Sequence, residues 1–383
     1  MKITEIETLP VSVGPGYDYA VIIVLVRTDE GLTGIGEASL AGRGRGVLGI
    51  LDHFRDLLVG QDPGRIEHWW SEMTRGTFWS NGQVIMSAVA GIDLALWDLK
   101  GKRLGVPVYE LLGGPTRDRV RVYRHLAGDS AAALVEDALR WREQGFTALR
   151  YGSLAAFDEE GLARWDPQRS IVETIAATEA LRSALGDGVD LLLDAHTMFS
   201  PAEAAYLGRA LEPFRLYFYE DPIRPLNPSS LQLVRDKVNL PLATGEQLSH
   251  KWEFQPLIEN ELVDYLRIDM VHAGGITEAK KILAAGEMHG QRSALHHASS
   301  PVNGVACLHV DMAVPNFGIQ EWMELEPLYE LFPNAPRAKD GYVVPPSGPG
   351  LGLEFDEDEA RRRPSRDAAL PSRSWPDGSV ADY

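Results

Sequence analysis

Near the start of the chain, the hydrophobic positions alternate with the short period of β-strands. Ile3 to Val13 alternates loosely, and Tyr19 to Thr28 is rich in β-branched residues. Asp29-Glu30-Gly31 then supplies a turn before Leu32 to Ala38, so we predict an antiparallel sheet here. From Gly46 to Leu112 the hydrophobic positions take a helical period instead. The first part of the chain is therefore predicted to be a small sheet followed by helices.

The pattern changes after Gly113-Gly114-Pro115, which we take as a domain boundary. Short apolar runs then alternate with longer amphipathic segments such as Ala131 to Gln144, as strands alternate with helices in a parallel α/β fold. The tail from Pro333 to Tyr383 is rich in proline, glycine and charge, and we predict an irregular extension. The apolar runs are Val120 to Tyr123, Ala148 to Tyr151, Val189 to Leu193, Leu216 to Tyr219, Leu240 to Thr244, Tyr265 to Ile268, Ser293 to Leu295 and Phe317 to Ile319.

Polar residues interrupt these runs repeatedly at their C-terminal ends, which favours a closed barrel over an open sheet. In a (β/α)8 barrel all strand C-termini open on one face, where active sites lie. Asp194, Glu220 and Glu246 end three consecutive runs, and successive members are 26 residues apart. Because this spacing suits one strand–helix unit, the three carboxylates are expected at matching depth on adjacent strands.

Taken singly, each of these acids is more often a helix N-cap or a surface group. Three carboxylates crowded together repel one another and take up protons unless a cation lies between them. Oxygen ligands suit Mg²⁺, and no cluster of histidines or thiolates in the sequence points to zinc. We therefore predict that Asp194, Glu220 and Glu246 hold one Mg²⁺.

Asp269 and His296 end the sixth and seventh runs and form a second group. An aspartate bonded to one ring nitrogen raises the basicity of the other, so His296 is predicted to be a general base near neutral pH. His196 shares a strand end with Asp194, and we predict that it is an acid on the opposite edge of the metal. A lone histidine is more often a hydrogen-bonded packing residue, which is the interpretation we adopt for His53, His68, His250, His289 and His309.

Composition narrows the classes of partner. The chain has 383 residues with 55 acidic and 37 basic side chains, so its formal net charge is −18. This charge disfavours nucleic acid and anionic membranes as partners. The single cysteine, Cys307, excludes a disulfide within the chain and fits a reducing compartment. No apolar run is long enough to span a bilayer and no signal peptide is recognisable, so we predict a cytoplasmic protein.

Longer motifs resemble the mandelate racemase branch of the enolase superfamily, nearly from end to end. One of them is the series of carboxylates Asp194, Glu220 and Glu246. The others are Ser87 to Lys102 before Leu111-Leu112-Gly113-Gly114, Ala273 to Thr277, Val314 to Glu321 and Pro376 to Ser379.

The resemblance implies a modified TIM barrel, (β/α)7β, with an N-terminal α+β capping domain that the C-terminal tail completes. We place the capping domain at residues 1–115, the barrel at 116–330 and the extension at 331–383. The resemblance further implies one Mg²⁺ per subunit and a homo-oligomer between dimer and octamer. The implied chemistry is proton abstraction next to a carboxylate to give an enediolate.

Within this branch the chain is most similar to the sugar-acid dehydratases of the mannonate and galactonate groups. Arg150 matches an arginine of the mannonate group, but the stretch Phe157 to Trp165 has no tyrosine where that group has one. Asp269 instead fits the aspartate–histidine pair of galactonate dehydratases and racemases. The expected reaction is dehydration of an aldonate such as mannonate, galactonate or gluconate to a 2-keto-3-deoxy acid.

The resemblance also assigns roles. His296 with Asp269 is the base, and His196 is the acid that protonates the leaving hydroxyl. Glu321 hydrogen-bonds the substrate carboxylate, which requires a protonated glutamic acid or a donor nearby. The expected substrate contacts are Arg150, His125, Tyr151, Arg45 and Tyr19.

Two alternatives remain open from the sequence. A racemase or epimerase would need a second base, either His196 or Tyr151. A non-catalytic protein would keep the fold and have a binding role.

Overall fold

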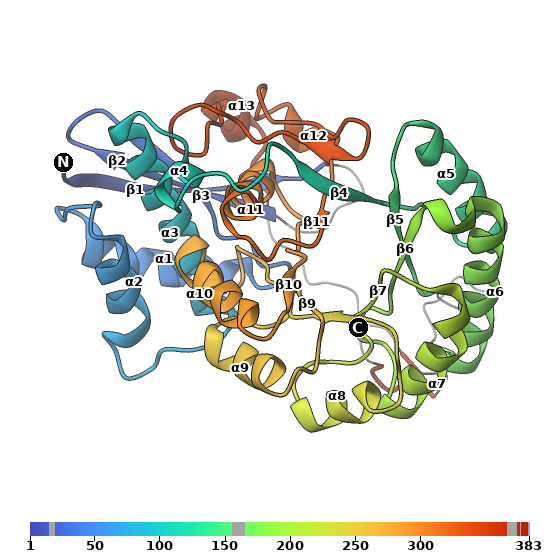
Figure 1. Ribbon diagram of the computed structural model, residues 1–383. Coiled ribbons are helices and arrows are strands. Elements are labelled where there is room, and N and C mark those ends of the chain that lie inside the picture. Colours follow the sequence, from blue (N-terminus) through green and yellow to red (C-terminus); the bar gives the residue numbers. More distant parts are fainter. Residues whose placement is uncertain (15–19, 155–164, 366–373, 376, 382–383) are drawn as a thin grey trace.

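The computed structural model describes residues 1–14, 20–154, 165–365, 374–375 and 377–381. Tyr19 lies outside the described residues, as does most of the stretch Phe157 to Trp165. The described chain forms a small sheet with helices at one end and a larger, strongly curled sheet with helices outside it at the other (Figure 1).

The small sheet is the predicted N-terminal sheet. Its three strands are antiparallel in the order β1 (Ile3–Ser12), β2 (Ala20–Thr28) and β3 (Thr33–Glu37). Gly36 shows why β3 and its neighbouring helix lie so close, because an added Cβ there would lie 2.0 Å from the carbonyl oxygen of Gly91. Its helices are α1 (Gly44–Leu58), α2 (Ile66–Arg75), α3 (Gln83–Leu104) and α4 (Val108–Leu111).

The larger sheet has the order β10-β9-β8-β7-β6-β5-β4-β11, and neighbouring strands in this series are parallel. A parallel bridge between Ser293 and Phe317 joins the two ends of the series, so the sheet curls back on itself. The modified barrel predicted from the sequence is thereby confirmed. The strands are β4 (Val120–His125), β5 (Ala148–Gly152), β6 (Asp190–Asp194), β7 (Phe218–Glu220), β8 (Leu242–Thr244), β9 (Tyr265–Leu266), β10 (Arg292–Ser293) and β11 (Gln320–Glu321).

Helices between these strands cover the outside of the curled sheet (Figure 1). Several begin with a capping side chain followed by proline, which has no N–H to satisfy and a backbone angle suited to the first turn. Ser200 and Ser300 are examples. The helices are α5 (Ala131–Glu143), α6 (Pro167–Leu185), α7 (Pro201–Leu211), α8 (Pro228–Arg235), α9 (Lys251–Glu259), α10 (Ile276–Glu287) and α11 (Pro301–Ala313).

The interior of the curled sheet is packed with side chains, one from the region of each strand. This layer closes the barrel core, so the space for a ligand lies at the strand C-terminal ends. The layer consists of Tyr123, Ala148, Leu192, Phe218, Ala243, Tyr265, Ala294 and Ile319.

The tail contacts both parts of the molecule through α12 (Glu326–Tyr329), β12 (Tyr342–Val343) and α13 (Glu357–Arg362). β12 pairs antiparallel with β4 of the barrel. The backbone N–H of Leu351 donates to Asp98 of α3 at 2.8 Å, and Arg361 of α13 pairs with Glu7 of β1 at 2.5 Å. The capping domain is therefore completed by the tail, while the exact limits 1–115, 116–330 and 331–383 stay predictions.

Among the described helices, none has the length and apolar character that a membrane crossing requires.

Candidate active site

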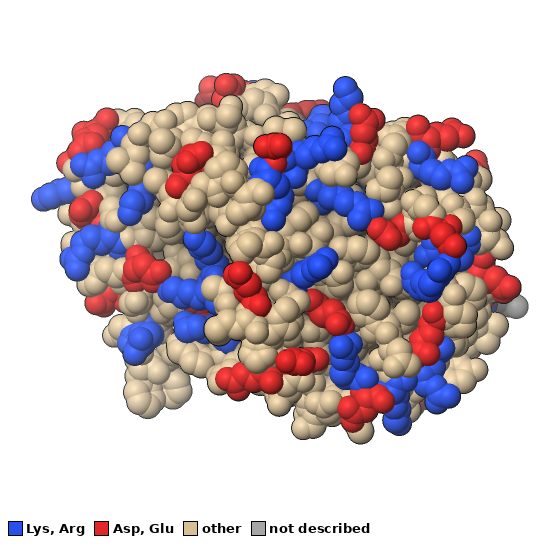
Figure 2. All heavy atoms as spheres, in the orientation of Figure 1, with Lys and Arg blue, Asp and Glu red and all other residues tan. Residues whose placement is uncertain are grey.

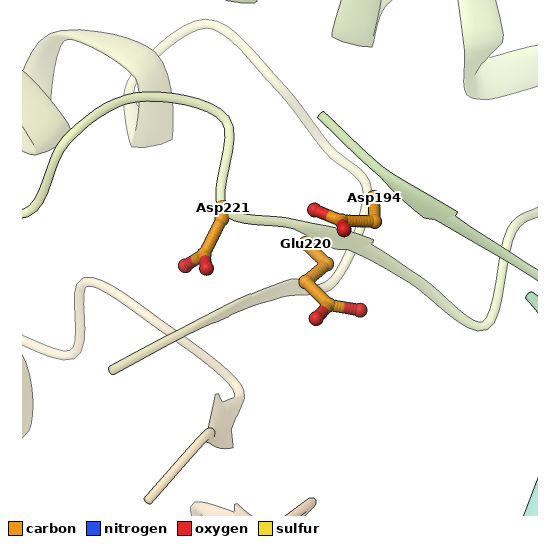
Figure 3. Close-up of side chains that lie close together, drawn as sticks. All are labelled: Asp194, Glu220 and Asp221. Carbon is orange, nitrogen blue, oxygen red and sulfur yellow. The ribbon is translucent and has the colours of Figure 1, made fainter. Parts of the chain in front are cut away.

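Strand register brings the first two predicted carboxylates together. Asp194 at the end of β6 pairs directly with Glu220 at the end of β7. Figure 3 shows these two side chains at adjacent strand ends, with Asp221 beside them. Asp194, Glu220 and Asp221 each offer one oxygen, and the three oxygens lie within 4.8 Å of one another.

Asp221 was missed by the sequence reasoning, which named Glu246 as the third ligand. Alternate residues of a regular strand face opposite sides, so a regular strand would point Asp221 away from Glu220. Its φ of 38° breaks that alternation, and the hydroxyl of Thr244 donates to its Oδ1. Glu246 lies at the same opening but outside this three-oxygen group, and its prediction as a ligand stays untested.

A buried arginine directly after β9, Arg267, joins the carboxylates. Its Nη2 lies 2.5 Å from Glu220 Oε1, 3.2 Å from Glu246 Oε2 and 2.9 Å from Glu321 Oε2. Its Nη1 donates to the hydroxyl of Tyr123 at 2.8 Å. The signal for Arg267 was present in the sequence, because it is a charged residue inside an otherwise apolar run and two positions before Asp269.

Arg150 is the second guanidinium at the cluster. It pairs with Asp194, and its Nε lies 3.7 Å from Glu220 Oε2. Burial opposes ionisation of Asp194, but Arg150 and the neighbourhood of His196 outweigh it and lower the pKa of this carboxyl. Burial dominates at Glu220 and raises its pKa to about 8, and it raises the pKa of Asp221 well above the ordinary value.

The cluster fits a hard divalent cation. Both oxygens of Glu220 and Oδ2 of Asp221 are buried without a hydrogen-bond donor of good geometry among the described residues. The 2.5 Å contact of Glu220 with Arg267 is thus an ion pair rather than a hydrogen bond. Carboxylate oxygens that are crowded and unsatisfied in this way match the ligand preference of Mg²⁺.

The Asp269–His296 contact expected from the sequence is present. Asp269 Oδ2 lies 2.5 Å from His296 Nδ1, and the backbone N–H of Val271 donates to Asp269 Oδ1 at 2.7 Å. Burial opposes the charged form of Asp269, but His272, His296 and this backbone donor outweigh it and lower its pKa to about 2. The carboxylate therefore stays ionised and orients the ring.

The other ring nitrogen of His296 faces the carboxylates. Its Nε2 lies 3.6 Å from Glu246 Oε2 and 3.9 Å from Glu321 Oε2. Burial disfavours the imidazolium, but Glu246, Glu321 and Asp269 outweigh it and raise the pKa of His296 to about 10. Without added positive charge at the cluster, the ring is therefore protonated at neutral pH.

Glu321 is held ionised. Burial opposes its charge, but Arg267, His296 and His125 outweigh burial and hold its pKa well below the ordinary value. Its Oε1 lies 2.7 Å from His125 Nε2, and its Oε2 accepts the backbone N–H of His297 at 2.9 Å. Glu321 cannot donate a proton to a substrate carboxylate in this state, so the nearby group with permanent N–H donors is Arg267.

The remaining predicted residues fall in different places. His196 lies beside Asp194, whose Oδ1 accepts its backbone N–H at 2.7 Å. The prediction that Tyr151 contacts the substrate is wrong. Its side chain is buried in the layer between sheet and helices, with its hydroxyl 2.6 Å from Thr178 Oγ1, so it faces away from the opening. Among the described residues, Arg45 is exposed and lines a surface pocket that includes Leu48 and no member of the carboxylate cluster.

Comparison with known proteins agrees with this geometry. Residues 4–113 match the mandelate racemase / muconate lactonizing enzyme N-terminal domain, and residues 133–359 match the enolase C-terminal domain-like family. A D-mannonate dehydratase of Caulobacter vibrioides is 37% identical, with 96% of this chain and 97% of the relative covered. A D-galactonate dehydratase family member of Streptomyces bingchenggensis is 40% identical, with 96% and 95% covered.

A solved structure of a relative has the same fold over its whole length. The crystal structure of an enolase from Pantoea ananatis with bound D-gluconate and Mg has a TM-score of 0.93 and 34% identity, and 99% of each chain is covered. The matches span both the capping domain and the barrel, which confirms the resemblance that the motifs indicated. The chain belongs to the mandelate racemase / muconate lactonizing enzyme family of the enolase superfamily.

Proposed function

We propose that the protein is a sugar-acid dehydratase that removes water from an aldonate such as mannonate, galactonate or gluconate and releases a 2-keto-3-deoxy acid. The observation that carries the proposal is the Asp269–His296 pair, whose second ring nitrogen faces a cluster of carboxylates and arginines. The full-length relatives named as mannonate and galactonate dehydratases support this substrate class, as does the structural relative with bound D-gluconate.

His296 is assigned the removal of the C2 proton. Asp269 accepts from Nδ1, so the lone pair of the neutral ring lies on Nε2, the nitrogen on the open side. Mg²⁺, held by Asp194 and Glu220 with Glu246 or Asp221, would supply positive charge that lowers the pKa of His296 and favours negative charge on the substrate carboxylate. The ring would then be neutral at the start of the reaction, as a base must be.

Loss of the C3 hydroxyl completes the elimination. The electron pair of the broken C2–H bond forms the C2=C3 double bond through the enediolate, and the C3–O bond breaks. His196, which follows Asp194 in the chain, is assigned the donation of a proton to the departing oxygen, so that water leaves. The enol then moves its proton from the C2 oxygen to C3 and becomes the 2-keto-3-deoxy acid.

Arginines rather than glutamic acid are assigned the contacts to the substrate anion. Arg267 is buried with its guanidinium in contact with three carboxylates, and Arg150 contacts Asp194 and Glu220. A guanidinium stays protonated at any ordinary pH, so neither residue is a base, and both can donate to carboxylate or hydroxyl oxygens. His125, whose Nε2 lies 2.7 Å from Glu321 Oε1, is a third polar side chain at this edge.

A substrate screen tests the proposal. The purified protein with Mg²⁺ is incubated with a panel of mono- and diacid sugars, epimers side by side, and 2-keto-3-deoxy acid is measured. We expect turnover of one or a few aldonates. An epimer formed without loss of water would show an epimerase instead, with His196 as its second base, since Tyr151 is bonded to Thr178. No turnover across the panel would favour a binding role.

A further inference from the structure

A second histidine, His272, faces the same aspartate as the proposed base. Its Nδ1 lies 3.5 Å from Asp269 Oδ2, the oxygen that also contacts Nδ1 of His296. The two imidazole rings are tilted by 31° to each other, and their centroids are 6.5 Å apart. His272 therefore belongs to the candidate active site, although the proposed elimination gives it no task.

Only one ring nitrogen of His272 is engaged by the protein. Besides Asp269, its Nδ1 lies 3.4 Å from the carbonyl oxygen of Glu246, so both neighbours of Nδ1 are hydrogen-bond acceptors. The other nitrogen, Nε2, has no hydrogen-bond partner among the described residues. The side chain of His272 is 23% exposed, against 15% for His296 and 3% for Asp269. His272 thus offers an accessible polar atom beside the proposed base.

The loop that carries His272 is held in place by the capping domain. Trp70 of α2 donates from Nε1 to the carbonyl oxygen of Gly274 at 2.9 Å. Gly275 lies so close to α3 that an added Cβ would be 2.3 Å from Asp93 Oδ2. At the start of the loop, the backbone N–H of His272 donates to Oδ1 of the dyad aspartate at 3.2 Å. A polar atom whose position is set before binding loses little conformational entropy when it contacts a ligand.

Selection among acid sugars depends on side chains of this kind at the opening. Figure 2 shows acidic and basic side chains interspersed over the face in view, and a surface of mixed charge does not distinguish one small anion from another. The guanidinium groups of Arg150 and Arg267 suit the carboxylate, which all aldonates share. Discrimination between epimers requires polar atoms aimed at single hydroxyl groups.

We propose that His272 determines specificity, with its Nε2 hydrogen-bonded to one hydroxyl of the acid sugar at C4, C5 or C6. The assignment rests on the proposed function, in which the carboxylate contacts the arginines, C2 loses its proton to His296 and the C3 hydroxyl leaves. The hydroxyls beyond C3 are then the ones left for a neighbouring side chain to recognise. A hydroxyl both donates and accepts, so the bond forms whichever ring nitrogen of His272 carries the hydrogen.

Binding of aldonates and their deoxy analogues tests the assignment. The probes are D-gluconate, D-galactonate and D-mannonate, followed by the 4-, 5- and 6-deoxy analogues of the one that binds, each titrated by calorimetry with Mg²⁺ present. One deoxy analogue should bind the wild-type protein about 3- to 10-fold more weakly than its parent, the loss expected for one hydrogen bond. That difference should disappear in His272→Asn, because asparagine reaches only as far as Nδ1 and has no atom in place of Nε2.

The matched variant is His272→Gln, whose longer side chain brings an amide to the position of Nε2. It should keep the preference for the parent aldonate over the deoxy analogue. His289→Asn is the control, since His289 follows α10 and its Nδ1 lies 3.5 Å from Glu261. The control should bind every probe as the wild type does, and Mg²⁺ affinity should be the same in all variants.

Two results would overturn the role of His272 alone. One is an aldonate that binds the wild type while none of its deoxy analogues binds more weakly. The other is a preference that survives in His272→Asn and is lost in His272→Gln, which would show that Nδ1 supports the loop and that Nε2 contacts nothing. If none of the three aldonates binds or turns over, the proposed function itself fails, and the role of His272 fails with it.

Discussion

Asp93 on α3 is a buried acid whose protonation should make the stability of the whole molecule depend on pH. Its Oδ2 accepts the backbone N–H of Thr277 at 3.1 Å, at the start of α10, so a capping-domain residue caps a barrel helix. Its Oδ1 has no donor among the described residues. Burial outweighs the bonds to Thr277 and raises the pKa of Asp93 to about 7, against 3.8 for an ordinary aspartate.

The sign and size of the effect follow from this difference. Because the folded state keeps the proton to higher pH than the unfolded state, the stabilisation is complete below about pH 4 and is lost as pH rises towards 7. At about 1.4 kcal/mol per pKa unit, the difference corresponds to at most about 4 kcal/mol. Asp93→Asn removes this dependence, so the variant should exceed wild type in unfolding free energy by about 2–4 kcal/mol at pH 8 and match it within about 1 kcal/mol at pH 4.

Urea unfolding at pH 4, 6 and 8 measures the effect for wild type, Asp93→Asn and the control Asp56→Asn, which changes an exposed acid of α1. The control should follow wild type at every pH. If Asp93→Asn is less stable than wild type at pH 8 by the same amount as at pH 4, then Asp93 acts as a charged helix cap and the reasoning from burial is refuted.

Three further substitutions probe the site and its supports. Glu37→Gln should lower kcat about tenfold with little change in KM, measured by steady-state kinetics, because buried Glu37 accepts from Ser300 Oγ at 2.5 Å and holds the loop after His296. An unchanged kcat would remove Glu37 from that positioning role. Arg267→Lys should raise KM for the acid sugar about 10- to 100-fold, because one ammonium cannot replace a guanidinium shared by three carboxylates; an unchanged KM contradicts the anion contact. Asp269→Asn should lower kcat about 10³- to 10⁴-fold while Mg²⁺ affinity, followed by calorimetry, stays within about threefold, as the comparable loss of an orienting aspartate does in serine proteases.

Residues at regular strand ends were predictable because the register of parallel strands is regular. The spacing of 26 residues placed Asp194 and Glu220 together, and they pair directly. Asp269 and His296 follow neighbouring strands, and a parallel bridge joins them. In both cases the fold prediction alone was enough to bring the side chains into contact.

Residues outside that regularity were not predictable. Asp221 joins the cluster through a positive φ angle, which a strand pattern does not reveal. Tyr151 was predicted as a substrate contact, but successive strand residues face opposite sides, and it points into the helix layer. Arg267 was not predicted because it lies inside the apolar run Tyr265 to Ile268 rather than at the C-terminal end of that run.

Exchange of the C2 proton in deuterium oxide tests the central claim most directly, because it isolates the first step from the loss of water. With an accepted aldonate and Mg²⁺, the His196→Asn variant should still exchange the C2 proton of the substrate, since the base His296 is intact. It should form little 2-keto-3-deoxy acid. His296→Asn should abolish exchange, with Mg²⁺ affinity unchanged as the check that the carboxylates are in place. Exchange that persists in His296→Asn would contradict the assignment of His296 as the base, and with it the account of this site.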